Sequence, residues 1–425
     1  MTGQPLAGVR VLDLTSVVVG PGCTWRLGQY GAEIIKVEAP EGDLMRGLGG
    51  LSPTGQHSGA YLHLNRGKRN VCLDLKKPGA AVVMEKLVAK SDIIVANMRP
   101  RALERLGLDA KTIRAKHPEK IYCLITGYGT DGPYAGRPTY DSVVQGASGM
   151  AGLTLVRDGH PAYVPMMICD HVAGEIAAGA ILAALVKRNK QGIGSTLEVP
   201  MFETMAAFVM QEHLAQISFD PAVGPPGDQR LLNPNNKPLR TADGWIAVTI
   251  NTDPQVRAFL RAVGRNEALS DERFATVAAR ARNVKEWFAV RGAALSSKST
   301  AEWLAIFQAV DIAAMPVHSL ETLRRDEHLV AVDLVKMEDH PTEGRVAAIR
   351  STIRIDDEYP PRLTPAQPQG ADTRALLREV GLSASEIDDL VSSGTAIVQQ
   401  SQTARVVPEI GSNQLGHHVQ TEIRR

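Results

Sequence analysis

Val9-Arg-Val-Leu-Asp-Leu14, followed by Glu33-Ile-Ile-Lys-Val-Glu38, opens a series of short apolar runs that indicate β-strands. The later runs are Asn70-Val-Cys-Leu-Asp-Leu75, Asp92-Ile-Ile-Val-Ala96 and Lys120-Ile-Tyr-Cys-Leu-Ile-Thr126. Helical patterns over 78–90 and 109–116 separate some of these strands. Strands that alternate with helices are typical of a doubly wound fold. The sequence therefore predicts an α/β domain with a largely parallel sheet.

Polar or turn-forming residues follow these predicted strands. They are Thr15 and Ser16, 40–43, 97–99 and 127–132. In parallel sheets, ligands gather beyond the carboxyl ends of the strands. We therefore expect a ligand site along this edge of the sheet.

The chain is long enough for two domains. Pro221-Ala-Val-Gly-Pro-Pro-Gly227 is typical of a linker, and Thr241-Ala-Asp-Gly-Trp-Ile-Ala-Val-Thr249 indicates a turn and a strand of a smaller α/β domain. An amphipathic helix is expected over 383–391. We predict a large domain over 1–220, a linker and small domain over 221–315, a return to the large domain over 316–397, and a polar tail over 398–425.

Composition and charge narrow the class of protein. The 425 residues carry a formal net charge of +1, which gives no signature of a nucleic-acid partner. The chain has four cysteines without metal-binding spacing, Cys23, Cys72, Cys123 and Cys169. We interpret them as reduced core thiols of a cytosolic protein. The N-terminus has no signal pattern, and no apolar run approaches the ~20 residues of a membrane span. We expect a cytoplasmic protein without a nucleic-acid, membrane or metal partner.

Asp170 is the candidate for the chemistry. It lies in Pro165-Met-Met-Ile-Cys-Asp-His171, directly before an apolar run over 172–186 that predicts a buried helix. At the N-cap of that helix, Asp170 would accept N–H donors and face the positive end of the helix dipole, so we expect an ionised carboxylate. An anionic carboxylate in an apolar site can act as a nucleophile. A purely structural cap is the alternative.

Three motifs argue against other enzyme classes. Gly20-Pro-Gly22 lacks the GxGxxG spacing of dinucleotide-binding folds, and Pro21 removes an N–H donor. Gly146-Ala-Ser-Gly149 lacks one residue of the GxSxG nucleophile elbow and indicates a turn. Cys169 and His171 are too close in sequence to predict a Cys–His pair in space, so Cys169 is interpreted as a core residue.

Asn65-Arg-Gly-Lys-Arg-Asn70 clusters three cations around a glycine. Such groups beside flexible N–H donors suit a diphosphate or a 3′-phosphate, and a solvated surface turn is the alternative. Arg99, Arg101 and Arg105 provide a second basic edge. The two basic patches make a phosphorylated carrier a plausible ligand.

Together these stretches resemble the class III CoA-transferase family, which includes formyl-CoA:oxalate and carnitine CoA-transferases and has α-methylacyl-CoA racemase as a relative. The resemblance runs from about Leu6 to Ile397. It is carried by Gly8-Val-Arg-Val-Leu-Asp-Leu-Thr15, Gly31-Ala-Glu-Ile-Ile-Lys-Val-Glu-Ala-Pro-Glu-Gly-Asp43, Asn65-Arg-Gly-Lys-Arg69, Gly127-Tyr-Gly-Thr-Asp-Gly-Pro-Tyr134, Tyr140-Asp141, Asp170 and Thr241-Ala-Asp-Gly244.

The resemblance implies an interlocked homodimer that takes coenzyme A or acyl-CoA as a substrate and holds no permanent cofactor. It makes Asp170 the nucleophile that exchanges CoA between an acyl-CoA thioester and a free carboxylic acid. The intermediates are an acyl-aspartyl anhydride and an aspartyl-CoA thioester. Family contacts to CoA fall on Val18, Ala39, Leu73, Asp74, Leu75, Lys76, Asn97, Met98, Arg99, Arg105, Thr139, Tyr140 and Asp141. We expect Arg105 to face phosphate and Tyr140 to flank the pantetheine or acyl end.

Two departures from the family pattern bear on the substrate. Racemase relatives carry a histidine where Tyr140 stands, so Tyr140 favours a transferase. Formyl-CoA:oxalate relatives have a glutamine at Val18 and a glycine run near 224–229, which disfavours oxalate as the acceptor.

Three hypotheses follow. The first is a CoA-transferase, with succinyl-CoA as a candidate donor and the polar stretch 230–240 as either an acceptor site or a solvated loop. The second is a 2-methylacyl-CoA racemase, for which His171 is the nearby candidate base. The third is a CoA-binding protein without turnover.

Overall fold

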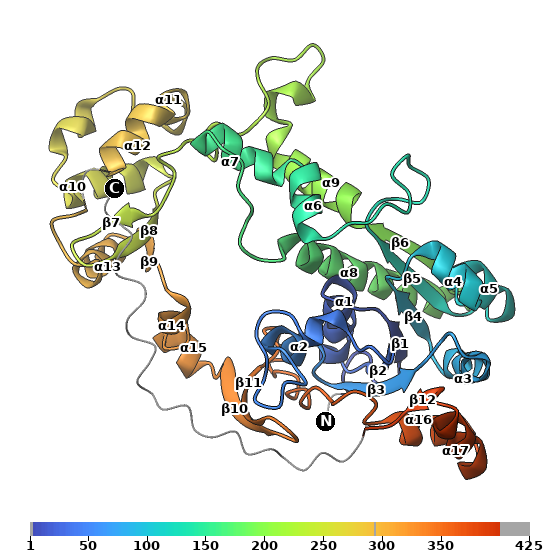
Figure 1. The fold of residues 1–425 in the computed structure, drawn as a ribbon. Helices are drawn as coiled ribbons and strands as arrows, with labels where there is room; N and C mark the ends of the chain where they lie inside the picture. The colour runs from blue at the N-terminus through green and yellow to red at the C-terminus, as the bar shows by residue number, and fades with distance from the viewer. Residues whose placement is uncertain (1–2, 293–294, 400–425) are drawn as a thin grey trace. The chain divides into compact units, whose positions relative to one another are not determined.

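The computed structural model describes residues 3–292 and 295–399, and the chain forms two compact units (Figure 1). Unit 1 contains the residues up to 124, 174–197 and those from 336 onward, whereas unit 2 contains 125–173 and 198–335. The predicted domain boundaries near 220, 315 and 397 stay a prediction. From residue 400 the predicted polar tail lies outside the described residues.

Unit 1 is built on a seven-stranded sheet with the order β12-β3-β2-β1-β4-β5-β6. The strands are β1 (Arg10–Leu14), β2 (Glu33–Glu38), β3 (Lys68–Leu73), β4 (Ile93–Ala96), β5 (Ile121–Thr126), β6 (Thr196–Pro200) and β12 (Ala396–Ile397). From β3 to β5 the neighbours pair in parallel, and β12 joins β3 antiparallel. The register sets Val11 beside Ile34 on one side and Ile93 on the other. The predicted α/β fold with a large, mainly parallel sheet is confirmed.

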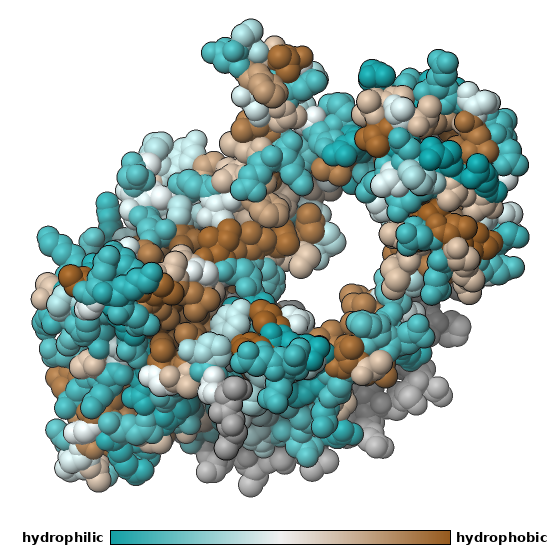
Figure 2. All heavy atoms as spheres, turned by 180° about the vertical axis from the view of Figure 1, so that it is seen from behind, coloured by the Kyte–Doolittle hydropathy of each residue, from teal (hydrophilic) through white to brown (hydrophobic). Residues whose placement is uncertain are grey.

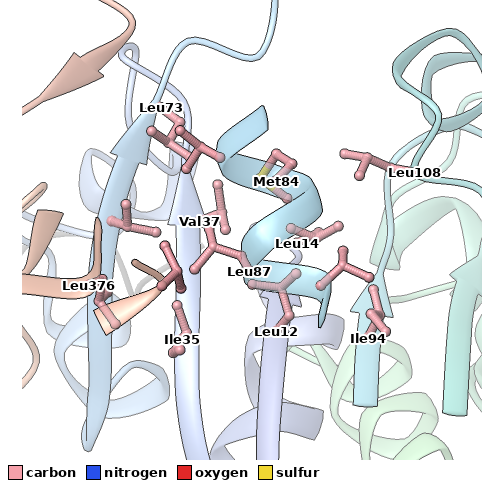
Figure 3. Packing of buried hydrophobic residues seen from close by; sticks show 14 of the residues in the cluster. Leu12, Leu14, Ile35, Val37, Leu73, Met84, Leu87, Ile94, Leu108 and Leu376 are labelled. Carbon is pink, nitrogen blue, oxygen red and sulfur yellow. The ribbon is translucent and has the colours of Figure 1, made fainter. Parts of the chain in front are cut away.

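Helices cover this sheet and bury the apolar residues of its central strands on both faces. All four residues of β4, for example, are buried. The helices and the remaining strands of this part of the chain are α1 (Val19–Gln29), α2 (Gly59–Leu64), α3 (Pro78–Ala89), α4 (Pro100–Leu106), α5 (Ala110–Lys116), α16 (Thr373–Glu379), α17 (Ala384–Ser392), β10 (Val335–His340) and β11 (Gly344–Ile349). Figure 3 shows Leu12, Ile35 and Ile94 packing with Leu87 and Leu376. Each fully buried side chain of this kind stabilises the fold by about 1.5–3 kcal/mol.

The strand order reverses between β1 and β4, and the loops after these two strands are tied together. Asn97, which follows β4, accepts a hydrogen bond from Ser16 N at 3.0 Å and donates one to Ser16 O at 2.9 Å. Val17 has a φ of 71°, which a β-branched residue rarely adopts. Its N–H donates to Asp43 Oδ1 at 3.0 Å and holds the strained turn in place. Ligands bind at such reversal points, and backbone strain is concentrated at functional sites.

Two buried lysines support these loops from within the sheet. Lys36 Nζ contacts Asp43 Oδ2 and Thr15 O, each at 2.8 Å. Lys68 Nζ donates to Asp13 Oδ2 at 3.0 Å. Burial alone would raise the pKa of Asp13, but the two ammonium groups and two threonine hydroxyls lower it to about 2. The buried charges are therefore compensated by partners.

α8 (Ile168–Gln191) is the longest helix among the described residues. Gly174 lets it approach α1, since a Cβ there would lie 2.7 Å from Val19 O. The predicted start at residue 172 is wrong, because the helix begins at Ile168. The expectation that no apolar run approaches a membrane span is also wrong, because α8 is long and apolar enough to cross a membrane. Half of its most apolar stretch is buried inside the protein, and the core helix of a folded domain can have the same length and composition.

Unit 2 contains a smaller three-stranded sheet with antiparallel pairs, in the order β7-β8-β9. Its elements are α6 (Asp141–Ala147), α7 (Met150–Asp158), α9 (Met201–His213), β7 (Leu239–Arg240), β8 (Trp245–Thr249), α10 (Asp253–Ala262), α11 (Val277–Arg282), α12 (Val284–Gly292), α13 (Thr300–Ala309), β9 (Ala313–Pro316), α14 (Leu320–Leu323) and α15 (Glu327–Ala331). Phe307 stacks on both Phe259 and Trp303 in the core beside this sheet. The strand predicted within 241–249 is present as β8.

Candidate active site

Asp141, at the start of α6, caps the first turn of α8. Its Oδ1 accepts hydrogen bonds from the N–H groups of Cys169 at 2.7 Å and Asp170 at 3.3 Å. Both carboxyl groups are buried, with 7% of Asp170 and 8% of Asp141 exposed. The prediction that Asp170 is the N-cap is therefore wrong, since it lies inside the first turn and another residue performs the capping.

Gln145 holds this arrangement and was not singled out from the sequence. Its Nε2 donates to Asp141 Oδ2 at 2.7 Å and reaches the carbonyl oxygens of Val164 and Met166, each at 3.2 Å. Its Oε1 accepts from Val164 N at 2.9 Å. One buried amide thus joins α6 to the segment that leads into α8. The i, i+4 spacing of Asp141 and Gln145 on one helix is the signal that could have revealed the first of these bonds.

The carboxylate of Asp170 is desolvated and has no stabilising partner among residues 3–292 and 295–399. Burial, followed by the negative charge of Asp141, raises the pKa of Asp170 from 3.8 to about 7. Its oxygens accept no hydrogen bond from the described residues, because the Asp170 contact with Asp141 uses its own backbone N–H. The expected fully ionised, capped carboxylate is wrong in both respects. A poorly solvated carboxylate without hydrogen-bond donors is free to attack an electrophile.

The neighbours of Asp170 differ in what they can contribute. Cys169 is fully buried, and burial together with Asp141 and Asp170 raises the pKa of its thiol to about 12, which agrees with a core cysteine. His171 is exposed and points about 100° away from Asp170 around the helix. Tyr140 is 62% exposed at the N-cap of α6. Thr139, just before it, has a buried hydroxyl without a partner in the described part of the chain.

The residues predicted to contact CoA from unit 1 follow the carboxyl ends of four parallel strands. Val18 comes after β1, Ala39 after β2, 73–76 at the end of β3, and 97–99 after β4. Because these strands are parallel neighbours, their ends meet at one edge of the sheet. The structure therefore brings together these residues, which the sequence spreads over 82 positions from Val18 to Arg99.

This group contains both buried and exposed residues. Val18 and Leu73 are fully buried, Asp74 Oδ1 accepts from Lys76 N at 3.1 Å, and Leu75 and Met98 pack on the core. The exposed members are Ala39, Lys76, Arg99 and Arg105. Arg99, Arg101 and Arg105 have no ion pair within residues 3–292 and 295–399, so this basic edge, which runs from the N-cap to the last turn of α4, is free to meet an anion.

The other basic cluster, Asn65 to Asn70, has a structural role. Lys68 pairs with Asp13, Arg66 contacts Glu338, and Arg69 contacts Glu33 and Glu379. Both interpretations from the sequence, a phosphate clamp and a solvated turn, are wrong. The acidic partners come from distant parts of the chain and neutralise all three cations.

Comparison with known proteins identifies the class to which this fold and site belong. Residues 6–373 match the model of CoA-transferase family III, and the chain belongs to that family. Over 412 residues it is 30% identical to the mouse succinyl-CoA:glutarate CoA-transferase, covering 94% of this chain and 92% of the relative. It is 33% identical over 362 residues to the probable fatty acyl-CoA transferase Rv3272 of Mycobacterium tuberculosis, covering 83% and 92%.

A solved structure supports the same assignment. The crystal structure of a CAIB/BAIF family protein from Brucella suis superposes with a TM-score of 0.76 at 27% identity, covering 89% of this chain and 100% of that one. The expected family membership is confirmed. The protein is a family III CoA-transferase, an enzyme class whose substrates are CoA thioesters.

Proposed function

We propose that Asp170 is the nucleophile of this CoA-transferase and that it carries both the acyl group and CoA in turn. One observation supports this role above the others: its carboxylate is buried, lies beside a second carboxylate, and accepts no hydrogen bond from the described residues. The carboxylate oxygens of a capping aspartate would accept hydrogen bonds from helix N–H groups. Asp141 fulfils that function here, which leaves Asp170 for chemistry.

In the first half of the reaction, an Asp170 carboxylate oxygen attacks the thioester carbonyl carbon of the donor. The carbon–sulfur bond breaks, CoA leaves as a thiolate, and an acyl-aspartyl anhydride remains. The thiolate then attacks the Asp170 carbonyl carbon, the anhydride bond to that carbon breaks, and the donor acid leaves as a carboxylate. CoA is now held as an aspartyl thioester.

The second half repeats these steps in reverse order with another acid. The acceptor carboxylate attacks the aspartyl thioester and forms a second anhydride with release of the thiolate. The thiolate attacks the acceptor carbonyl carbon, and Asp170 leaves as a free carboxylate. No net proton or electron is transferred, so the residues near Asp170 need only orient the groups and exclude water.

CoA itself is proposed to bind along the edge formed by the strand ends. Arg99 and Arg105, which have no ion pair in the described part of the chain, suit its phosphates. Asn97, Met98 and the 73–76 turn lie at the same edge. The start of α6 supplies the other proposed contacts, from Thr139, Tyr140 and Asp141. Asp141 links this turn to the proposed nucleophile, because it accepts a hydrogen bond from Asp170 N. Tyr140 is exposed, as a residue flanking the pantetheine arm or acyl group must be.

Succinyl-CoA is the first donor to test, because one relative is named succinyl-CoA:glutarate CoA-transferase. The other relative is named a probable fatty acyl-CoA transferase, so a panel of acids is required. A cytoplasmic location is proposed from the four buried, free cysteines.

A homodimer is proposed from the family and from exposed apolar side chains. Hydrophobic side chains remain on the surface shown in Figure 2. On α8 and α9, Ile176, Val186, Phe208 and Met210 are 45–56% exposed. Such surfaces are typical of sites that a partner covers. Sedimentation velocity of the purified protein would test this, and a monomer at micromolar concentration would contradict it.

The test of the nucleophile is intact-protein mass spectrometry after incubation with succinyl-CoA, with and without a hydroxylamine quench. We expect a CoA-sized adduct on the wild type and a hydroxamate at residue 170 after the quench. Asp170→Asn should give neither. Asp158→Asn, at an exposed aspartate, is the matched control and should behave like the wild type.

A racemase gives a different result in the same samples. If neither adduct forms with any of a panel of acyl-CoAs, while α-deuterium from solvent enters a 2-methylacyl-CoA, the proposal is wrong and a racemase replaces it. The exposed His171, directed away from Asp170, supports the transferase instead.

A further inference from the structure

A pocket of about 530 Å³ lies in unit 2 beside β8, α11 and α12. Its apolar wall includes Val277, Val284, Trp287 and Phe288, and its polar lining includes asparagine and arginine side chains. Among the described residues that line it, none is acidic. The volume falls within the range of small-molecule sites in proteins. None of the lining residues belongs to the proposed CoA edge or the Asp170 site.

Arg291 is a buried cation of this pocket, with 8% of the residue exposed. Its Nη2 donates to Val248 O at 2.7 Å, and its guanidinium carbon lies 4.8 Å from the Phe288 ring centroid. Its Nε, however, has no hydrogen-bond partner in the described chain. Burial lowers the pKa of Arg291 to about 10, so the group is still a cation at neutral pH. A buried, incompletely bonded guanidinium is costly unless something pairs with it.

Two other buried arginines of this protein have carboxylate partners. Arg46 pairs with Glu38 at 2.9 Å, and Arg280, which also lines the pocket, pairs with Asp253 at 2.7 Å. Arg291 has no carboxylate oxygen within 4.0 Å in residues 3–292 and 295–399.

The third arginine at the pocket, Arg230, pairs with Asp228 at 2.6 Å. Arg230 belongs to the polar stretch for which the sequence left open an acceptor site or a solvated loop. Within the described part of the chain, the pocket therefore keeps a single uncompensated positive charge, on Arg291, beside an aromatic wall.

We propose that this pocket binds a small organic monoanion, a carboxylate with a short apolar tail, whose carboxylate pairs with Arg291 and whose tail packs against Trp287. One carboxylate satisfies the one unpaired cation, and a guanidinium binds a carboxylate through two parallel hydrogen bonds. The apolar wall explains why a simple inorganic anion is a poorer fit. This inference does not depend on the proposed role of Asp170.

Binding of sodium butyrate to the full-length protein tests the proposal, with Trp287 as the fluorescent reporter. Butyrate should change the fluorescence in a saturable way, and Trp287→Phe should remove that change. Arg291→Met keeps an unbranched, flexible side chain that fills the inner part of the space and removes the charged guanidinium, so the Kd of butyrate should rise at least about tenfold. Arg265→Met, at an exposed arginine of the same unit, should leave the Kd unchanged within about twofold.

A second comparison uses only the wild type, in case Arg291→Met does not fold. Butyramide has the shape of butyrate without its charge and should bind at least about tenfold more weakly. Equal binding of butyrate and butyramide would overturn the proposal. So would wild-type affinity in Arg291→Met, a lack of any saturable signal, or displacement of butyrate by an equal concentration of chloride. Asp170→Asn should bind butyrate as the wild type does, which separates this result from a failure of the proposed catalytic role.

Discussion

Replacing Asp170 by asparagine should make the protein more stable, and the gain should grow with pH. The pKa of Asp170 is raised from 3.8 to about 7 by burial and by the charge of Asp141. Between these two values the folded protein holds a proton that the unfolded chain has lost, so stability falls as pH rises through that window. Asparagine has the same shape and nothing to ionise, and it therefore escapes this loss.

The size of the effect follows from the two pKa values. A pKa difference of one corresponds to about 1.4 kcal/mol. Above pH 7 the free energy of unfolding of the wild type is therefore lower by about 4 kcal/mol than it would be with a neutral side chain at position 170. At pH 5 the loss is only about 1.5 kcal/mol. The advantage of Asp170→Asn should therefore grow by about 2.5 kcal/mol between pH 5 and pH 8.

Urea unfolding of both proteins at the two pH values, followed by tryptophan fluorescence, measures this difference. The control is Asp158→Asn, because the hydrogen bond and charge of Arg157 lower the pKa of that exposed carboxyl, and its removal should bring no gain that grows with pH. If the advantage of Asp170→Asn is the same at pH 5 and pH 8, or smaller at pH 8, the carboxyl is not destabilised in the folded protein and the argument fails.

Other perturbations test the surroundings of the site. Asp141→Asn removes one of the two causes of the raised pKa of Asp170. In initial-rate profiles of the wild type we expect kcat/KM to rise with pH near pH 7, and in the variant this rise should move to lower pH. An unmoved midpoint would contradict this. Lys68→Met leaves the buried carboxylate of Asp13 without its ion-pair partner and should cost about 3 kcal/mol in urea unfolding, whereas a cost below about 0.5 kcal/mol would mean that the pair contributes little. Gly127→Ala places a Cβ 2.0 Å from Thr139 Cγ2, so kcat should fall about tenfold or more with an unchanged far-UV circular dichroism spectrum, and a wild-type rate would show that the threonine moves aside freely.

The fold could be predicted because its signals are local. The apolar runs over 9–14, 33–38 and 92–96 match β1, β2 and β4 to within one residue at each end. In a parallel sheet both faces are covered, so each run contains adjacent apolar residues, such as Val11-Leu12, Ile34-Ile35 and Ile93-Ile94, which make it easy to recognise. The clustering of the predicted CoA residues follows from the same topology, because parallel strands end at one edge.

The detail of the site depends on contacts that are distant in sequence. Asp141 lies 29 residues before Asp170, yet it caps the helix, and its negative charge adds to the burial that raises the pKa of Asp170. Lys68 and Asp13 are 55 residues apart, and nothing in the basic stretch around Lys68 indicates that a carboxylate neutralises it. The sequence singled out Asp170 as the candidate nucleophile, but the environment of its carboxyl group could be described only from the tertiary structure.

The pair of hydrogen bonds between Asn97 and Ser16 makes one amide group a point of chemical ageing. It joins the turns after β1 and β4 by donating and accepting at once. Hydrolysis of that amide to a carboxylate, a slow reaction to which asparagine is prone, would leave two acceptors facing each other where Nδ2 now meets Ser16 O. The link would be reduced from two bonds to one, beside a valine that already holds an unfavourable φ. Long storage or heating would then loosen this edge of the sheet before it affected the core.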